Sequence, residues 1–251
     1  PRPHGAAHAS PCTNSGKPAS HPVLIATGTE GLVIDGLVKA ALELDLIDET
    51  SVKKHPHAFE ALKAAVAHIS LEQVAAQTRM SVESLKDTVT IFAEASRSII
   101  LCAEGIVRRP DGYQNVLKLI DLAWITGKLD QPGCGVNTVT EEPNEQGAVD
   151  MGAAPEFLPG QVSFNDQTAR DRFAKAWDVT LPAAGSGANL VEILKGCKTG
   201  QIRALYVIGE NPLATLPAAM EVRGALDRLE LLGVQDQVLT GTAVMAQAGG
   251  L

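Results

Sequence analysis

The sequence lacks most of the patterns that would state its function directly. Its four cysteines are scattered without a CxxC pair, which excludes a local zinc knuckle or cluster-binding run and indicates a reducing compartment. No apolar run approaches the roughly 20 residues that a membrane helix requires. A Ser/His/Asp grouping, HExxH, a Walker A loop and a complete GxGxxG are also missing, so none of these chemistries is indicated.

Basic residues are too few to indicate binding to nucleic acid. The net charge is −8, whereas a nucleic-acid surface needs clustered Lys and Arg. With 45% hydrophobic and 20% charged residues, the 251-residue chain has the composition of a globular protein that buries one large core or two modest ones. No signal-peptide pattern follows Pro1, so we expect a fragment or a processed piece, located in the cytoplasm without direct membrane insertion.

The strongest structural pattern lies near the carboxyl end of the chain. Ala204–Ile208 is a short apolar run typical of a buried parallel strand, and Gly209–Pro212 interrupts it. Met220–Leu229 has the period of a helix, and Leu231–Val234 is a second apolar run. This order predicts a βαβ unit with a right-handed crossover. Ligands of such sheets bind beyond the carboxyl ends of the strands.

Two earlier apolar runs, Val23–Ala26 and Ser98–Leu101, are also followed by a polar turn and then by helical periodicity. The first turn contains Thr29 as a candidate helix cap and Glu30 near the positive end of the helix dipole. Helices are expected at Val33–Leu44, Phe59–Ile69 and Leu117–Ile125. The sequence therefore predicts an α/β protein whose strands are parallel.

Composition divides the chain into four parts. Residues 1–20 are rich in Pro, Ala, Ser and Gly and have no period, which predicts a flexible arm. Residues 21–130 are expected to form an α/β and helical part, and residues 166–251 are expected to form a Rossmann-like βαβ domain. Between them, residues 131–165 are rich in Gly and Pro. So long a stretch within a compact domain predicts an ordered loop that approaches a ligand by its backbone.

Several motifs resemble one family when they are taken together. They are Gly127–Gly135 (GKLDQPGCG), Asn144–Gly152 (NEQGAVDMG), Leu158–Gly160 (LPG), Tyr206–Leu213 (YVIGENPL), Gln235-Asp236 and Thr240–Ala243 (TGTA). In this order and spacing they resemble the molybdopterin-dinucleotide oxidoreductases, nearest to formate dehydrogenase catalytic subunits and the large iron–sulfur subunit of respiratory complex I, the NADH dehydrogenase. The resemblance implies Rossmann-like parallel sheets with flanking helices, as in the middle domains of the DMSO-reductase-like fold.

The resemblance also implies a cofactor, molybdopterin guanine dinucleotide, held at the loops after the strands. The residues expected to bind it are Gly28, Thr29, Glu30, Glu104, Gly105, Arg108, Asn144, Gln146, Gly147, Gly209, Asn211, Gln235 and Asp236. Catalytic residues, metal ligands and iron–sulfur cysteines of the family precede the matched region, so we expect none of them in this chain.

Two of these residues carry specific roles. Asp236 ends a strand, so its carboxylate is expected to project into the crevice and accept hydrogen bonds from the ring N–H and amino group of a guanine. Its alternative role is to cap the following turn. Asn211 can both donate and accept, which suits a ribose or a pterin edge. Glu104 departs from the family pattern, and a carboxylate facing an anionic dinucleotide is unfavourable unless Arg108 or Arg109 offsets it.

The chain departs from formate dehydrogenases where formate would bind. The positions that match their Arg and Gln near the metal hold Thr140 and Glu142. A threonine cannot supply the bidentate clamp that a formate carboxylate needs. We therefore expect the chain alone to be inactive towards formate.

Three interpretations remain open. The chain is the cofactor-binding portion of a molybdenum oxidoreductase that takes part in electron transfer, with iron–sulfur clusters on partner subunits or domains. Alternatively, it is a non-catalytic scaffold of a complex I-like redox assembly with no cofactor bound. The third interpretation is an unrelated Rossmann-like domain that binds a nucleotide.

Overall fold

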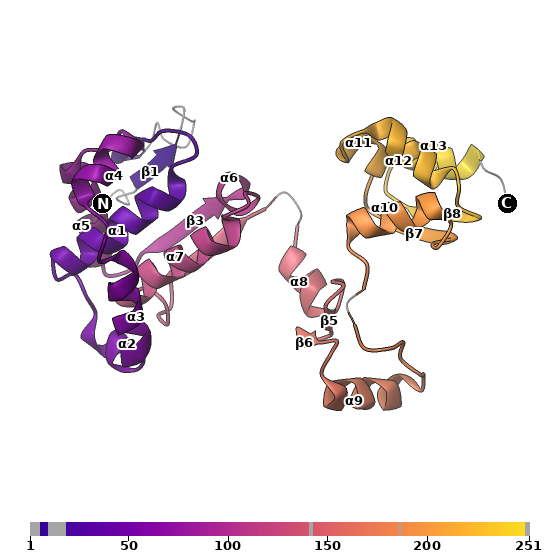
Figure 1. Ribbon diagram of the computed structural model, residues 1–251, viewed down its shortest axis with the longest axis horizontal. Coiled ribbons are helices and arrows are strands. Elements are labelled where there is room, and N and C mark those ends of the chain that lie inside the picture. Colours follow the sequence, from indigo (N-terminus) through magenta and orange to yellow (C-terminus); the bar gives the residue numbers. More distant parts are fainter. Residues whose placement is uncertain (1–5, 10–18, 141–142, 186, 249–251) are drawn as a thin grey trace. The chain divides into compact units, whose positions relative to one another are not determined.

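The computed structural model describes residues 6–9, 19–140, 143–185 and 187–248 (Figure 1). The chain divides into two compact units, Pro1–Pro143 and Asn144–Leu251. This division falls inside the Gly/Pro-rich stretch 131–165. None of the described helices combines the length and hydrophobicity needed to span a bilayer.

Helix α1 (Glu30–Glu43) is the centre of the first unit. It contacts α4 (Leu71–Thr78), α5 (Val82–Glu94) and α7 (Gly112–Ile125), and α2 (Glu49–Lys53) and α3 (Pro56–Val66) complete the helical part. The core consists of apolar side chains from these elements, among them Val33, Val38, Val74, Leu85, Val89 and Ile125. The apolar face of each helix, which repeats every three to four residues, is buried in this core.

Two small parallel sheets belong to the same unit. Strand β1 (Ala6–Ala9) pairs with β2 (His21–Leu24), and β3 (Ile99–Ala103) pairs with β4 (Gly135–Val139). The short helix α6 (Glu104–Val107) follows β3 directly. The turns after β2 and β3 therefore both lie at carboxyl ends of parallel strands.

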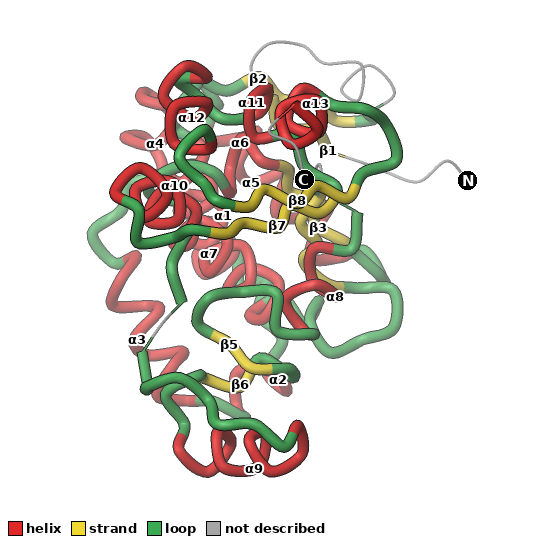
Figure 2. Tube along the Cα trace, turned by 90° about the vertical axis from the view of Figure 1, so that its right-hand side faces the viewer, coloured by secondary structure: helices red, strands yellow, loops and turns green. Residues whose placement is uncertain are grey.

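The second unit begins with α8 (Glu145–Asp150) and an antiparallel pair, β5 (Phe157–Leu158) and β6 (Val162–Ser163). Helices α9 (Gln167–Trp177) and α10 (Leu190–Thr199) follow, then β7 (Ala204–Ile208), α11 (Pro212–Thr215), α12 (Ala219–Leu226), β8 (Leu231–Gln235) and α13 (Gly241–Ala248). Figure 2 shows β7 beside β8, and Ala204 pairs with Leu231 in parallel register. The strand–helix–strand unit is therefore present.

The α/β class and the parallel strands are confirmed. The expected strand Ala204–Ile208 has the observed bounds, whereas β2 begins two residues before the expected Val23. Four strands were not predicted. Strand β1 lies in the stretch expected to be a flexible arm, and β4, β5 and β6 lie in the stretch expected to be a loop. Most of residues 1–20, together with Glu142, lies outside the described residues.

One predicted helix cap is wrong. Thr29 occupies the N-cap position of α1 but caps no N–H group of the helix, because its hydroxyl donates to the Ala26 carbonyl at 2.7 Å. The Gly28 N–H instead donates to Oε1 of Glu30 at 3.2 Å. Thr29 and Glu30 therefore both stabilise the turn before α1, and the Thr29 side chain does not cap the helix.

Candidate cofactor-binding site

The second unit exposes polar groups at the carboxyl ends of β7 and β8. Gly209 follows β7 with φ +64°, and its N–H donates to the Gln235 carbonyl at 2.8 Å. No atom lies within 4 Å of the position that a Cβ of Gly209 would occupy. The positive φ, rather than crowding, therefore favours glycine here, and the space above the strand end is open.

Asn211 joins the loop after β7 to the start of α13. Its Oδ1 accepts hydrogen bonds from the backbone N–H of Thr242 at 3.2 Å and from the Thr242 hydroxyl at 2.8 Å. The same hydroxyl oxygen accepts from the Leu213 N–H at 3.3 Å, and Thr242 is fully buried. The Nδ2 group of Asn211 makes no hydrogen bond among the described residues. The amide thus fixes the loop with its oxygen and retains two donor hydrogens for a ligand.

Two other polar side chains at this edge, Glu210 and Gln235, form hydrogen bonds with neighbouring residues. Glu210 is turned back on its own loop, where Oε1 accepts from the Asn211 N–H at 2.8 Å and the Thr215 hydroxyl at 2.7 Å. Gln235 accepts a hydrogen bond from the Tyr206 hydroxyl at 3.1 Å. These hydrogen bonds stabilise the loop after β7 and the end of β8, which remain lined by polar side chains.

Asp236 is exposed and has one engaged oxygen. Oδ1 accepts from the Gln237 N–H at 2.7 Å, a contact of the kind that the turn-capping alternative requires. The second oxygen makes no hydrogen bond within the described part of the chain. One carboxylate oxygen therefore remains available to a donor from a ligand.

In the first unit, Arg109 connects the turn after β2 with the loop after α6. Its Nη2 donates to the Gly28 carbonyl at 3.4 Å, and its Nη1 lies 3.5 Å from Oε2 of Glu30. Its Nε donates to Asp111 at 2.9 Å, and this contact raises the pKa of Arg109 and lowers that of Asp111. The guanidinium therefore ties Gly28 to a segment 81 residues further along the chain.

Two buried polar atoms beside this arginine have no hydrogen-bond partner among the residues that the structure describes. They are Oε2 of Glu30, which forms an ion pair with Arg109 but no hydrogen bond, and Nδ2 of Asn115. Asn115 is 1% exposed and helps lower the pKa of Asp111, yet its Nδ2 meets no acceptor with hydrogen-bond geometry. A buried polar group without a partner costs about 1–3 kcal/mol, which indicates that a polar partner belongs here.

Glu104 and Arg108 form an ion pair across one turn, with Arg108 Nη2 2.9 Å from the Glu104 carboxylate. This pair supplies the compensation that the unexpected carboxylate requires. Gly105 has no neighbour near the position of a Cβ, so the backbone of this loop is open to approach. Sequence reasoning named Arg109 only as an alternative offset and did not identify Asn115.

Asn144, Gln146 and Gly147 lie at the start of α8. Asn144 has φ +59°, and a Cβ on Gly147 would lie 2.4 Å from the Asn144 side-chain oxygen. Only glycine allows this close approach of the Asn144 amide. The expected site residues therefore form groups within each unit: the turns around Gly28 and Gly105 in the first, and α8 and the β7–β8 edge in the second.

The described residues contain no group of three or more His, Cys, Asp and Glu side chains that could hold a metal ion. Cys102 and Cys197 are buried, and burial raises the pKa of both thiols. Cys102 is a core residue that packs with Ile34 and Leu119. Neither thiol has the lowered pKa that a reactive cysteine requires.

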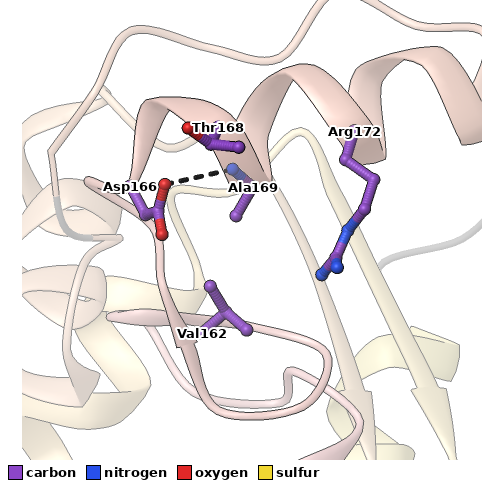
Figure 3. A pocket seen from close by; sticks show the side chains of 5 residues that line it. All are labelled: Val162, Asp166, Thr168, Ala169 and Arg172. Carbon is purple, nitrogen blue, oxygen red and sulfur yellow. Dashed lines mark hydrogen bonds between the residues drawn. The ribbon is translucent and has the colours of Figure 1, made fainter.

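A small pocket on α9 lies apart from the expected site residues. Figure 3 shows its lining, which consists of Val162, Asp166, Thr168, Ala169 and Arg172 around a cavity of about 230 Å³. Asp166 caps α9 by accepting from the Ala169 N–H at 3.1 Å. Pockets for drug-sized ligands usually measure about 300–1,000 Å³, so this cavity is too small for a dinucleotide.

Comparison with known proteins gives the family. The model of the molybdopterin oxidoreductase family matches residues 37–248. Formate dehydrogenase H of Escherichia coli (strain K12) is 33% identical over 224 residues, which cover 89% of this chain and 31% of that protein. The assimilatory nitrate reductase catalytic subunit of Bacillus subtilis (strain 168) is 30% identical over 225 residues, covering 88% of this chain and 31% of the relative.

A solved structure supports the fold. Acetylene hydratase from Pelobacter acetylenicus superposes with a TM-score of 0.69 at 17% identity, covering 96% of this chain and 35% of that one. The chain spans about a third of the length of the curated relatives that it matches. The likeness to acetylene hydratase shows the fold, and the family match over most of its residues shows that the chain belongs to the molybdopterin oxidoreductase family.

Proposed function

We propose that the chain is the portion of a molybdopterin oxidoreductase that binds the cofactor as its guanine dinucleotide. Family membership implies a molybdopterin cofactor. The observation that carries the guanine assignment is the β7–β8 edge, where Asp236 and Asn211 offer an unengaged carboxylate oxygen and an unengaged amide donor beside the open backbone of Gly209. The family match excludes one earlier interpretation of the sequence, that the chain is an unrelated nucleotide-binding domain.

At this edge the proposed roles follow from the chemistry of each group. The free oxygen of Asp236 accepts from the N–H groups of guanine, and the Nδ2 of Asn211 donates to a ribose or pterin oxygen. Gln235 is the last residue of β8 and adds a further amide. When bound, the cofactor supplies the redox-active molybdenum, while these residues hold and orient the dinucleotide.

The first unit fits an anionic part of the cofactor. The Arg109 guanidinium, with about a third of its side chain exposed, lies beside the N-terminus of α1, where helix N–H groups favour negative charge. The unpaired Nδ2 of Asn115 adds a buried donor. The Glu30 carboxylate opposes an anion there, and its pairing with Arg109 reduces that repulsion.

A second candidate function is a scaffold without bound cofactor in a complex I-like assembly. The threonine at position 140, in place of a formate-binding arginine, favours it, as does the engagement of Asp236 with its own turn. Both candidates place iron–sulfur clusters on partner subunits or other domains, and both place the protein in the cytoplasm. Molybdenum content and released pterin in the purified protein separate the two.

Asp236→Ala tests the proposed guanine contact. Titration of GDP and of extracted cofactor by calorimetry is expected to show binding weakened by about 1.5–3 kcal/mol, the range for a hydrogen bond to a charged group. If Asp236 only caps its turn, stability falls by about 1 kcal/mol and intrinsic affinity stays the same. Asp227→Ala is the matched control, because this exposed carboxylate follows α12 at the opposite end of β8. Equal affinity of the parent and Asp236→Ala proteins would refute the contact.

A further inference from the structure

A second small cavity opens in the first unit between the start of α3 and the last turns of α7. Its volume is about 230 Å³, and it is lined by His55, Ala58, Ile120, Asp121, Trp124 and Leu129. His55 and Ala58 are exposed, so the cavity is accessible from solvent in this chain. It is smaller than the roughly 300–1,000 Å³ of ordinary ligand pockets and matches the size of one long side chain.

The carboxylate of Asp121 has no partner in this cavity. It makes no hydrogen bond or ion pair with any residue that the structure describes, and burial is the one cause that raises its pKa. The nearby lysines of α7 and its following turn are engaged elsewhere: Lys118 pairs with Asp35 at 2.6 Å, and Lys128 donates to the Ala95 carbonyl at 2.6 Å. A partly desolvated carboxylate without a cation is unfavourable, so a positive charge from outside the chain would stabilise it.

The indole of Trp124 is fixed beside this carboxylate. Its Nε1 donates to the Ser51 carbonyl at 3.2 Å, and its ring makes edge contacts with His55 and Phe59 at centroid distances of 6.2 and 6.4 Å. Phe59 already has a cation over its ring, because Lys63 Nζ lies 4.9 Å from the centroid. An aromatic face together with a carboxylate is a combination that binds cations.

We propose that this cavity binds an arginine side chain of a partner protein. The aliphatic stem of arginine packs against Ala58, Ile120 and Leu129, while the guanidinium reaches Asp121 and Trp124. Arginine fits better than lysine, because its planar fork matches a carboxylate, stacks on an indole and is more weakly hydrated. The net charge of −8 also favours approach by a basic partner. This site is independent of the proposed cofactor contacts.

The chain offers a site-specific probe, because it contains two tryptophans in different units, Trp124 and Trp177. The full chain, with both indoles labelled with ¹⁵N, is titrated with acetyl-Gly-Arg-Gly-amide and, separately, with the peptide in which neutral citrulline replaces arginine. We expect the arginine peptide to shift the Trp124 indole signal saturably and to leave that of Trp177 in place. The citrulline peptide is expected to bind about tenfold more weakly or worse, the loss for a hydrogen bond to a charged group.

Three variants test the two features of the cavity separately. Asp121→Asn is expected to reduce arginine-peptide affinity to the citrulline level, while Asp87→Asn, the same charge change at an exposed site on α5, leaves it unchanged. Ala58→Leu retains the charge but fills the cavity and is expected to abolish the shift. The proposal is overturned if Trp124 does not respond, if citrulline binds as well as arginine, or if Asp121→Asn retains full affinity. The comparison of the two peptides on the unmodified chain decides the matter even if a variant fails to fold.

Discussion

Thr242→Val should loosen the loop that carries Asn211, although it hardly changes the volume of the side chain. The substitution removes the hydroxyl that donates to Asn211 Oδ1 at 2.8 Å and accepts from the Leu213 N–H at 3.3 Å. Thr242 is 0% exposed, so water cannot replace either contact. The lost hydrogen bond contributes about 1 kcal/mol, and a Leu213 N–H left without its acceptor adds about 1–3 kcal/mol. Together these two effects predict a local loss of stability of about 2–4 kcal/mol.

Thr242→Ser is the informative comparison, because it retains the hydroxyl and removes a methyl group. Its expected cost is about 1 kcal/mol, the value for one buried carbon. Hydrogen exchange followed by mass spectrometry is the suitable assay, since a chain of two units does not guarantee two-state unfolding. Peptides that cover residues 209–216 and 240–247 should exchange faster in Thr242→Val than in Thr242→Ser. The reverse order would show that packing, rather than the hydroxyl, holds this loop.

A companion substitution, Asn211→Asp, separates the clamp from the ligand contact. Aspartate retains an oxygen that accepts from both groups of Thr242 but loses the Nδ2 donor. Exchange protection of the loop should therefore stay close to that of the parent protein, while affinity for the guanine dinucleotide falls. An unchanged affinity would limit Asn211 to the clamp.

Three further outcomes are expected. Asp48→Ala removes the cap whose Oδ1 accepts from the Ser51 N–H at 2.7 Å and should cost about 1 kcal/mol at pH 7. Because the pKa of Asp48 is lowered on folding, its stabilisation is present above the unfolded pKa and lost as pH falls through the folded one, so melting curves of the two proteins should converge in acid. Gly31→Ala places a Cβ 2.4 Å from the Asn115 side chain and should lower the melting temperature, whereas Gly224→Ala, in open space on α12, should stabilise by about 0.5–1 kcal/mol. Formate-dependent dye reduction should be absent with the pure chain, and measurable reduction would show that the threonine at the clamp position is not limiting.

The sequence predicted those helices and strands that are marked by residues within or next to them. The apolar run of β7 and the end of α7 are each followed closely by a glycine, so the bounds of β7 and the last residue of α7 could be predicted from the sequence, whereas α7 begins five residues before the predicted Leu117. Strand β4 could not, because Gly135–Val139 begins with a glycine and contains a polar Asn-Thr pair. Its extended backbone depends on pairing with β3, 36 residues earlier at the Ile99–Gly135 pair.

The same distinction applies to the site. Because β7 and β8 are parallel, the polar residues that follow them lie at the same edge of the sheet. Asn211 and Asp236 could therefore be expected there. Their partners could not, because the Asn211–Thr242 contact joins residues 31 apart and the Arg109–Gly28 contact joins residues 81 apart. No local pattern encodes such pairs.

Asn211 shows how a structural role and a binding role fit in one side chain. Its oxygen is occupied by two donors from Thr242, and a ligand that needed this acceptor would have to displace both. The NH₂ group of the same amide makes no hydrogen bond within the described part of the chain. Fixing the oxygen also fixes the direction of the NH₂ group, since the amide is planar. The buried threonine therefore orients the donor that the proposed dinucleotide contact uses, and the loop after β7 can present it without ordering a side chain at the moment of binding.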